Sequence, residues 1–412
     1  METEVLEAPM EVLSAAPVSA PENGKIAKPV DFFVQVVGDI PNRAVISKCF
    51  IKAGSRLMFE FAPDAGYCLD IDKWPNFCNY CLVQRPSTET KAKRCTRCRQ
   101  VYYCDQHCQS KHWPTHKTEC KFIADLLETE GHEDPGFLRD ILLIRRAINN
   151  DTLKGVLGDM CDVELPVAAF VFKAIADHFR KIREFKDVPA EQILTILRRF
   201  QANSFTLLGE FNSQLGHGVF PFSSLVNHSC EPNLAATHIY ISGQKPVQTF
   251  AALRDIHPGE ELTHSYVDQL QPTSMRQEQL NSRYGFNCRC RRCLSPLPVD
   301  LNYLQFSPEI LNLTSDGEDI SLPELVVELD RLENILQGKA HWSLRHRQFQ
   351  LFSICFFKHR YQSALRLLNK VLTYDRLILS ENHPSFILHE RYKDHLEREL
   401  KKARKATIPS SK

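Results

Sequence analysis

The amino-acid sequence predicts an α+β fold. A β-rich core is expected to be divided in two by a cysteine-rich module and a helical segment, and to be followed by an all-helical C-terminal region. Three observations lead to this prediction: β-forming runs occur before and after the insertion, cysteine and histidine gather in two clusters, and apolar residues near the C-terminus recur at helical spacing.

Composition and charge narrow the classes of protein that the chain can belong to. At 412 residues it is longer than one hydrophobic core usually supports, so two or three packed units are expected. Lysine and arginine total 51 against 50 aspartate and glutamate residues, which gives no overall attraction for nucleic acid. Any basic surface is therefore local, and nucleic-acid binding stays open. We expect a monomer.

No feature of the sequence predicts a membrane protein. The longest apolar stretches are much shorter than the roughly 20 residues that span a bilayer. The chain begins with Glu2, Glu4, Glu7 and Glu11, where a secretory signal has a basic segment and an apolar core. We therefore expect no membrane partner and a location in the nucleus, the cytoplasm or both.

The first part of the chain contains an arm and then the first half of the β-rich core. Residues 1–29 are rich in proline, alanine and glutamate and predict a disordered arm. Residues 30–77 contain the runs 32–37 and 56–61, which are rich in β-forming residues and are separated by turn formers. We expect a few short strands here.

After the first cysteine cluster, a helical segment precedes a second β-rich segment. Apolar residues recur at helical spacing through residues 121–202, and strand-like runs punctuated by glycine and proline return in residues 203–270. One run, residues 238–243, is expected to form an arm of a hairpin. Residues 296–412 predict a helical C-terminal domain whose helix pairs could stack like tetratricopeptide repeats.

Two helices of the C-terminal domain have clear signals. One is expected to begin at a capping box, Ser321 to Glu324, and to end near Gly338, with leucines at helical spacing between them. The other is expected at residues 361–379.

The fifteen cysteines predict metal sites rather than disulfides, because the interior of the cell keeps thiols reduced. The first cluster, residues 78–120, offers eight ligands, enough for two zinc ions that each take four. His107 and His112 lie among them and are expected at the surface. Outside both clusters, four cysteines are expected to be small buried side chains: Cys49, Cys68, Cys161 and Cys355. The eight expected ligands are Cys78, Cys81, Cys95, Cys98, Cys104, Cys108, His116 and Cys120.

The second cluster contains the strongest functional signal. Residues 227–233 read Asn-His-Ser-Cys-Glu-Pro-Asn, residues 258–262 read Pro-Gly-Glu-Glu-Leu, and Ser265-Tyr266 follows. Three closely spaced thiolates come next and lack a fourth zinc ligand, for which Cys230 is the candidate. A third zinc ion would then join the two segments. Its ligands are Cys230, Cys288, Cys290 and Cys293.

Together these parts resemble the SET and MYND domain-containing lysine methyltransferase family over most of the chain after the arm. The ligand order around Tyr102-Tyr103-Cys104 and Trp113 resembles the MYND zinc finger, and the stretch from Asn203 to Cys293 resembles a SET domain with a post-SET zinc site at residues 271–295. The resemblance implies a SET fold that is split by the finger at residues 78–120. It also implies interleaved zinc ligands, with Cys78, Cys81, Cys104 and Cys108 in one set and Cys95, Cys98, His116 and Cys120 in the other.

The same resemblance implies an active site that uses S-adenosylmethionine (AdoMet). Tyr266 matches the catalytic tyrosine of the family, and Phe205 and Tyr284 would line a channel for the substrate lysine. His264 stands where an apolar residue is common, and we expect it to be structural. The residues that would contact AdoMet are Arg43, Asn203, Ser224, Asn227, His228, Tyr266 and Phe286.

The implied reaction has a clear physical requirement. A lysine amine attacks the methyl group of a sulfonium only when it is neutral, whereas free lysine, with a pKa of about 10.4, is almost wholly protonated at neutral pH. A narrow aromatic channel disfavours the charged form by desolvation, and a nearby sulfonium cation acts in the same direction. Alignment of the reacting atoms is the remaining task.

The resemblance also implies partners. These are a protein substrate, either a histone or another lysine-containing protein, and a proline-rich peptide at the MYND finger. The alternative is an adaptor whose SET domain has weak or no activity. Its basis is the turn at residues 38–44, which reads Gly-Asp-Ile-Pro-Asn-Arg-Ala where SET proteins usually have a glycine-rich turn beside the cofactor.

Overall fold

The computed structural model describes most of the chain between residues 34 and 406, and several predictions fall outside the described residues. These are the arm at residues 1–29, the turn residues 38–42, the capping residue Ser321 and the helix stop at Gly338. The described residues are 34–37, 43–85, 93–129, 134–163, 169–209, 213–296, 322–335, 342–379, 381 and 383–406.

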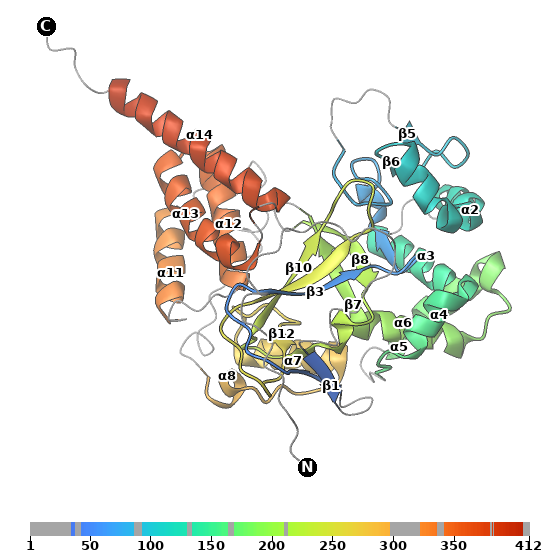
Figure 1. The fold of residues 1–412 in the computed structure, drawn as a ribbon. Coiled ribbons are helices and arrows are strands. Elements are labelled where there is room, and N and C mark those ends of the chain that lie inside the picture. Colours follow the sequence, from blue (N-terminus) through green and yellow to red (C-terminus); the bar gives the residue numbers. More distant parts are fainter. Residues whose placement is uncertain are drawn as a thin grey trace, which may run out of the picture.

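Strands from both sides of the insertion build the β-rich core (Figure 1). β3 pairs with β11, with Leu57 opposite Phe250, and β4 pairs with β8. Because the finger and a set of helices separate these partners in the sequence, the divided core is confirmed. The strands of the core are β1 (Val34–Val37), β2 (Ala44–Ser47), β3 (Arg56–Phe61), β4 (Tyr67–Leu69), β7 (Ser204–Leu208), β8 (Gln214–Val219), β9 (Asn227–His228), β10 (Leu234–Ile239), β11 (Val247–Ala252) and β12 (Thr263–His264).

Two antiparallel three-stranded sheets, in the orders β10-β11-β3 and β4-β8-β7, form the centre of the molecule. β11 is buried along its whole length, including its polar residues Gln248 and Thr249. β8 approaches β4 so closely that a Cβ atom on Gly216 would lie 2.0 Å from the carbonyl oxygen of Cys68. Only glycine therefore permits this pairing.

The hairpin expected around residues 238–243 is displaced. β10 and β11 do form an antiparallel hairpin, but β10 ends at Ile239. Gly243 has a φ of +81° and belongs to the connection between the strands. That left-handed conformation suits a turn and not a strand, so the predicted arm began too late in the chain.

A short parallel pair brings the two functional motifs together. β9 and β12 pair so that Thr263 lies opposite Asn227 and His264 opposite His228. The 3-10 helix η5 (Ser223–Leu225) leads into β9, and the backbone N–H of Ser229 donates to the carbonyl oxygen of His264. The predicted cofactor motif and Tyr266 are thus held side by side by backbone hydrogen bonds.

The finger consists of a small hairpin and a long helix, at one side of the molecule in Figure 1. A buried ion pair joins the helix to the rest of the chain: Arg146 donates to both carboxylate oxygens of Glu119, at 2.7 and 2.8 Å. The same guanidinium also donates to the carbonyl oxygen of Tyr67. The finger is therefore fixed to both the helical insert and β4. Its elements are β5 (Lys93–Arg94), β6 (Tyr102–Tyr103) and α2 (Gln106–Thr129), preceded by the 3-10 helix η2 (Ile71–Lys73).

The helical insert packs beside the sheet that contains β7 and β8 (Figure 1). Asp134 caps its first helix by accepting from the N–H of Phe137, and Phe179 and Phe185 are fully buried between its helices. The last helix runs directly into β7 at Ser204. The elements of the insert are α3 (Pro135–Asn149), α4 (Asp151–Gly158), α5 (Ala169–Lys181), η3 (Arg183–Phe185) and α6 (Ala190–Asn203).

The predicted post-SET region contains a helix that the sequence reading missed. α7 (Thr273–Tyr284) lies between Tyr266 and the last cysteine triplet and ends at Gly285, whose φ is +73°. This left-handed residue turns the chain back, so that the following cysteines face Cys230. The four-residue helix α8 (Arg291–Leu294) contains Cys293.

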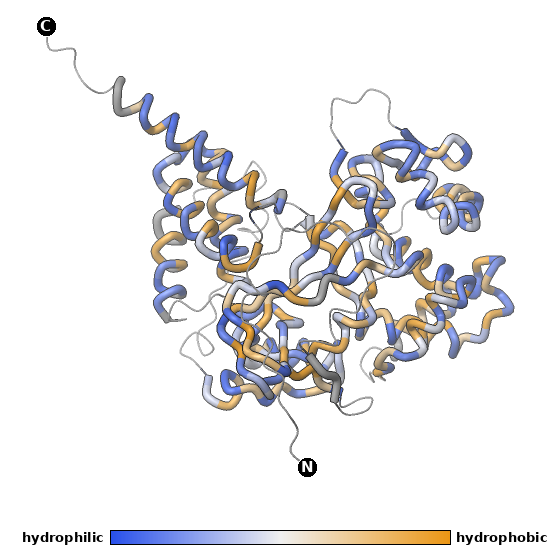
Figure 2. The backbone as a smooth tube through the Cα atoms, viewed as in Figure 1, coloured by the Kyte–Doolittle hydropathy of each residue, from blue (hydrophilic) through white to orange (hydrophobic). Residues whose placement is uncertain are grey.

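The C-terminal region is helical, as predicted, and lies on the opposite side of the core from the insert (Figure 1). Leu329 of the expected leucine stripe is buried, α13 matches the predicted helix 361–379 to within one residue, and α13 packs between α12 and α14. The end of α14 far from the core is largely hydrophilic (Figure 2). Its helices are α11 (Leu322–Ile335), α12 (Trp342–Phe357), α13 (Tyr361–Ile378) and α14 (Pro384–Ala406).

The resemblance of these helices to tetratricopeptide repeats stays a prediction. Within the described residues, no helix is both long and apolar enough to cross a membrane.

Candidate functional site

Cysteine and histidine side chains converge in three groups of four. In each group the candidate ligand atoms all lie within 4.8 Å of one another. The groups are those that the ligand order and the resemblance led us to expect, including the interleaving within the finger. They are Cys78, Cys81, Cys104 and Cys108; Cys95, Cys98, His116 and Cys120; and Cys230, Cys288, Cys290 and Cys293.

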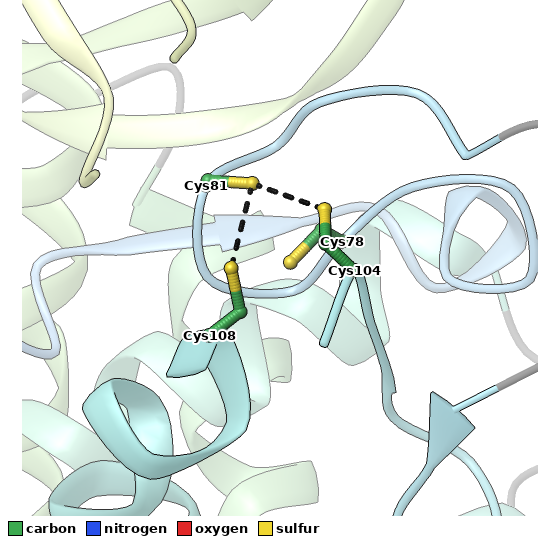
Figure 3. Close-up of side chains that lie close together, drawn as sticks. All are labelled: Cys78, Cys81, Cys104 and Cys108. Atoms are coloured by element: carbon green, nitrogen blue, oxygen red, sulfur yellow. Dashed lines mark hydrogen bonds between the residues drawn. The ribbon is translucent and has the colours of Figure 1, made fainter. Parts of the chain in front are cut away.

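The first finger group lies where the loop that carries Cys78 and Cys81 meets the start of α2, and its sulfur atoms face one another (Figure 3). The Cys81 sulfur is 3.6 Å from that of Cys104 and 4.0 Å from that of Cys108. Asp105 fixes the helix start by accepting from the backbone N–H of Cys108. This local cap thus positions Cys108 at the start of the helix.

The second finger group corrects one prediction. Nε2 of His116 lies 3.6 Å from the Cys98 sulfur. His112, which we expected at the surface, is buried, and its Nδ1 lies 3.0 Å from the Tyr103 hydroxyl. Because His112 is one turn before His116 on α2, the two rings stack on the same inner face of the helix. His107 is exposed, as expected.

The third group joins the motif at residues 227–233 to the chain after α7. The Cys293 sulfur lies 3.6 Å from the Cys230 sulfur, and the backbone N–H of Cys290 points to Cys288. Hydrogen bonding from Cys230 lowers the pKa of Cys290 to about 5, so that a thiolate is available at neutral pH. A thiolate is the form that binds metal ions.

His228 connects this group to Tyr266. Its Nδ1 accepts from the backbone N–H of Tyr266 at 2.9 Å, so in the neutral ring the proton is on Nε2. Nε2 lies 3.2 Å from the Cys230 sulfur and donates to it. One imidazole therefore links a predicted metal ligand to the backbone of the predicted catalytic residue.

Tyr266 lies in a group of rings that we call the aromatic wall, defined as Phe205, His264, Tyr266 and Tyr284. Its ring centroid is 4.8 Å from that of His264 and 4.9 Å from that of Tyr284. Its hydroxyl donates to the carbonyl oxygen of Val226 at 2.9 Å. Burial, and then the neighbouring Tyr284, raise the pKa of Tyr266, so the phenol is protonated at neutral pH.

The other predicted cofactor residues lie beside the wall. The Asn227 amide donates to the carbonyl oxygen of Arg43 and to the carboxylate of Glu261, at 2.7 and 2.8 Å. Phe286 packs near the His228 ring, with centroids 6.0 Å apart. Arg43, Asn227, His228 and Phe286 therefore belong to one neighbourhood.

Asn203 and Ser224 approach the wall from a second direction. The Asn203 amide donates to the carbonyl oxygens of Cys161 and Arg199, and the Ser224 hydroxyl donates to that of Pro221. Both residues line a cavity of about 530 Å³ that also reaches the four residues of the aromatic wall. Arg43, Asn227, His228 and Phe286 do not line it. Of the seven predicted cofactor residues, three therefore line the cavity and four lie outside its lining.

The cavity extends from the aromatic wall to the C-terminal helices, and the sequence reading missed this second side. Trp342, Arg345 and Arg347 of α12 and His383 and His389 line it. No motif marked them, and only their positions on helices expected to pack near the core could have suggested a role.

A cluster of buried ionisable residues lies on the C-terminal side of the cavity; we call Arg345, Asp375 and His389 the Asp375 cluster. Arg345 donates to Oδ1 of Asp375 at 2.7 and 2.8 Å, and Nδ1 of His389 lies 2.6 Å from Oδ2. The C-terminal helices also contact the segment that follows Tyr266. Arg347 of α12 pairs with Asp268 at 3.0 Å, and Ser343 accepts from the backbone N–H of Gln269. An ion pair and a hydrogen bond therefore join α12 to the β-rich core.

Residues 38–42 of the turn on which the adaptor alternative was based lie outside the described residues, and the described residues give no support to that alternative. Arg43 and Ala44, the last two residues of the turn, are described: Ala44 begins β2, and the Arg43 guanidinium donates to the carbonyl oxygen of Asp159 at 3.2 Å.

Comparisons with known proteins agree with the arrangement described above. N-lysine methyltransferase SMYD2-B of Danio rerio is 26% identical over 349 residues, covering 77% of this chain and 77% of that protein. SMYD2-A of Danio rerio is 29% identical over 351 residues, covering 75% and 76%. SMYD2 of Homo sapiens is 24% identical over 349 residues, covering 77% and 78%.

A solved structure described as the crystal structure of the SET domain of LSMT bound to lysine and AdoHcy covers 89% of this chain and 87% of that chain, with a TM-score of 0.36 and 11% identity, values too low to support any argument. The model of the SET domain family matches residues 42–267, which span the strands on both sides of the insertion and end just after Tyr266. Since this match covers more than half of the chain, the protein belongs to the SET domain family.

Proposed function

We propose that the protein is an AdoMet-dependent protein-lysine N-methyltransferase whose catalytic tyrosine is Tyr266. The observation that carries the proposal is the environment of this residue. Its protonated hydroxyl is held by Val226 in a buried aromatic wall beside a cavity, and its backbone is held by the motif residue His228. The names of the relatives, N-lysine methyltransferases, support the same reaction.

The residues near Tyr266 fit AdoMet chemically. The amide nitrogens of Asn227 and Asn203 donate to protein carbonyl or carboxylate groups, and within the described residues their Oδ1 atoms accept no hydrogen bond. These oxygens are suitable acceptors for the ammonium group of the cofactor's amino-acid part. Phe286 offers an aromatic face for the adenine, and Arg43 offers positive charge for the carboxylate. Bound AdoMet would supply an electrophilic methyl group on a sulfonium, which leaves as a neutral thioether.

The three cysteine-containing groups fit zinc. Each offers four soft ligands. Two groups have Cys₄ and one has Cys₃His composition, and both are sets typical of structural zinc sites. Within the described part of the chain, Nδ1 of His116 is buried without a hydrogen-bond partner, while Nε2 lies 3.6 Å from the Cys98 sulfur. Metal ions at these sites would hold segments together and take no part in the methyl transfer.

The aromatic wall is suited to preparing a lysine amine. Phe205 and Tyr284 present aromatic rings to the cavity, and a lysine amine packed between such rings loses water, which disfavours its charged form and promotes loss of its proton to solvent. The Tyr266 hydroxyl proton is already donated to Val226, so its oxygen lone pairs remain to accept an N–H of the amine. Tyr266 therefore orients the nitrogen lone pair and does not act as a base.

The size and extent of the cavity also favour a protein as the substrate. Its volume of about 530 Å³ and its extension to α12 and His389 leave room for residues on either side of a lysine. We infer that the C-terminal helices contribute to the choice of substrate, which is a histone or another protein. The finger contributes no residue to the lining of the cavity and is proposed to bind a proline-rich peptide.

Calorimetric titration with AdoMet tests the proposal directly. Zinc-loaded wild type is expected to bind with a Kd near the micromolar range, corresponding to about −8 kcal/mol. In Asn227→Ala the lost contacts to the charged cofactor should cost about 1.5–3 kcal/mol, a roughly ten- to hundredfold weaker Kd. Well-folded wild type that binds no AdoMet would refute the proposed activity, and a search for partners of the finger would then be indicated.

A further inference from the structure

The cavity beside the aromatic wall has an excess of positive charge. Among the described residues that line it, three are arginines, and Asp268 is the only acidic one. Asp268 pairs with Arg347 at 3.0 Å, and Arg345 pairs at 2.7 Å with Asp375, which does not itself line the cavity. The third arginine, Arg283, has no carboxylate partner within the described residues. Its charge is therefore the one that the described part of the chain leaves unbalanced.

The histidines of the cavity do not change this balance. Burial lowers the pKa of His238 and His264 to about 3 and the pKa of His346 and His383 to about 4, so these four rings are neutral at neutral pH. The fifth histidine of the lining, His389, lies against the carboxylate of Asp375. The arginines and Asp268 therefore set the charge of the lining.

Arg283 lies beside the predicted lysine channel. It is exposed, belongs to the last turn of α7 and directly precedes Tyr284 of the aromatic wall. Burial raises the pKa of Tyr284, and the charge of Arg283 acts in the opposite direction, so this charge reaches the wall. Gln279, four residues earlier and thus on the same face of α7, also lines the cavity. No hydrogen bond engages its side-chain amide within the described residues.

An unbalanced guanidinium here has a consequence for the substrate. A lysine that enters as an ammonium ion brings a second positive charge, and like charges repel more strongly where water is partly excluded. A carboxylate close to the lysine in the substrate removes this repulsion, because a guanidinium binds carboxylates through paired N–H donors. The amide N–H of Gln279 adds a further donor. The resulting ion pair is neutral overall, so it does not oppose loss of the lysine proton.

We propose that Arg283 and Gln279 form a subsite for an acidic side chain, and that the substrate carries aspartate or glutamate next to the target lysine. The inference rests on the proposed methyltransferase function and deepens it by naming the substrate class, a lysine in an acidic segment in place of a strongly basic histone tail. The geometry that carries it is an arginine at the cavity lining, next to Tyr284, that no carboxylate pairs with in the described part of the chain.

A binding experiment tests this without knowledge of the natural substrate. The probes are three bisubstrate compounds, in which the transferable methyl group of AdoMet is replaced by a link to the side-chain nitrogen of a lysine at the centre of a capped five-residue peptide. The four residues that flank the lysine are all aspartate, all asparagine or all arginine. Asparagine matches aspartate in shape and lacks its charge. Calorimetry measures the affinities for the full-length, zinc-loaded protein.

Wild type should prefer the acidic probe. At low salt it should bind the aspartate probe about fivefold more tightly than the asparagine probe, and the arginine probe most weakly, as expected for one accessible ion pair. Raising the salt concentration to about 0.5 M should reduce the preference, because exposed charges are then screened.

Three variants assign the preference to one side chain. Arg283→Gln should bring the aspartate and asparagine probes to within about twofold of each other, and Arg283→Glu should reverse the order so that the arginine probe binds best. Arg391→Glu is the matched control, since it makes the same change of charge at an exposed arginine of α14 that does not line the cavity, and it should keep the wild-type order. The Kd for AdoMet itself should stay within about twofold in all three.

The outcomes distinguish this inference from the proposed function. Wild type that binds AdoMet but does not prefer the aspartate probe overturns the acidic subsite alone, and so does a preference that persists in Arg283→Glu. A large loss of AdoMet affinity in Arg283→Glu would assign the arginine to the cofactor and also overturn the subsite. Absence of binding for AdoMet and all three probes overturns the methyltransferase proposal and, with it, the subsite.

Discussion

At the residue scale, hydrogen bonds within the protein decide which atoms of the site remain for ligands. The hydroxyl proton of Tyr266 is taken by Val226, and the amide protons of Asn227 are taken by Arg43 and Glu261. What remains in both cases is an oxygen lone pair. The site therefore offers hydrogen-bond acceptors. They match the N–H donors of a lysine amine and of the ammonium group of AdoMet.

Replacing Tyr266 by phenylalanine tests the role of the hydroxyl. The change keeps the ring in the aromatic wall but removes the acceptor for the amine, so kcat should fall about a hundredfold, a loss typical for one positioning hydrogen bond. The Kd for AdoMet should stay within about twofold of wild type. Single-turnover methylation of a responsive histone or peptide and calorimetry give the two values; an active variant would show that another group orients the amine.

The pH dependence of the reaction should reflect the substrate amine alone. The pKa of His264 is lowered to about 3, so this ring would gain a proton only as pH falls through that value, and the pKa of Tyr266 is raised, so the phenol stays protonated at neutral pH. Between pH 6 and 9 the rate should rise as the lysine deprotonates, with the same profile in His264→Phe. An inflection near neutral pH that disappears in this variant would contradict a neutral His264.

The ligand residues could be predicted from the sequence because their information is local, whereas burial and long-range contacts could not. Paired cysteines at short spacing allow few geometries, and all three groups form. His112 was misplaced because its partner Tyr103 comes from the hairpin of the finger, and no pattern shows which face of α2 turns inward. His389 and Arg345 reach the cavity only through the packing of helices.

At the element scale, the Asp375 cluster holds α12, α13 and α14 in one arrangement beside the cavity. Burial alone raises the pKa of Asp375, but Arg345 and His389 keep it below its ordinary value. The carboxylate is therefore charged at neutral pH. Its stabilisation is complete above the unfolded pKa of about 4 and is lost as pH falls through the lowered value.

Replacing Asp375 by asparagine should destabilise these helices strongly. The change leaves Arg345 buried without its counter-charge, which typically costs about 3–5 kcal/mol. Asp330→Asn is the matched control because Asp330 pairs with Arg366 and Lys370 at a half-exposed position, where such pairs contribute about 1 kcal/mol or less. Urea unfolding at neutral pH followed by circular dichroism measures both variants. Equal effects would show that the buried cluster has no special role.

The helix α7 shows where prediction from periodicity fails. Its sequence is strongly polar, and of its residues only Arg276 and Leu280 are buried. No apolar stripe marks such a helix. The helices α11 and α13 carry leucines at helical spacing and were predicted, because a helix that packs on a large core must present an apolar face.

At the scale of the whole molecule, the three cysteine-containing groups have two different structural roles. The two finger groups organise a segment that a buried ion pair attaches to the insert. The third group joins the motif at residues 227–233 to the chain beyond α7. Tyr284 is the last residue of α7, and Phe286 follows the helix directly after Gly285. Only the third is expected to control the geometry of the active site.

Removing one ligand from each kind of group tests this division. Cys293→Ser should release one zinc ion and free Tyr284 and Phe286 from the motif, so AdoMet binding should weaken by at least about tenfold, or roughly 1.4 kcal/mol. Cys104→Ser should also release one zinc ion, but because its group lies in the finger, the Kd should stay within about threefold of wild type. Zinc content by atomic absorption and AdoMet affinity by calorimetry are measured on the same preparations. Equal loss of affinity in both variants would mean that the finger, and not only the third group, supports the cofactor site.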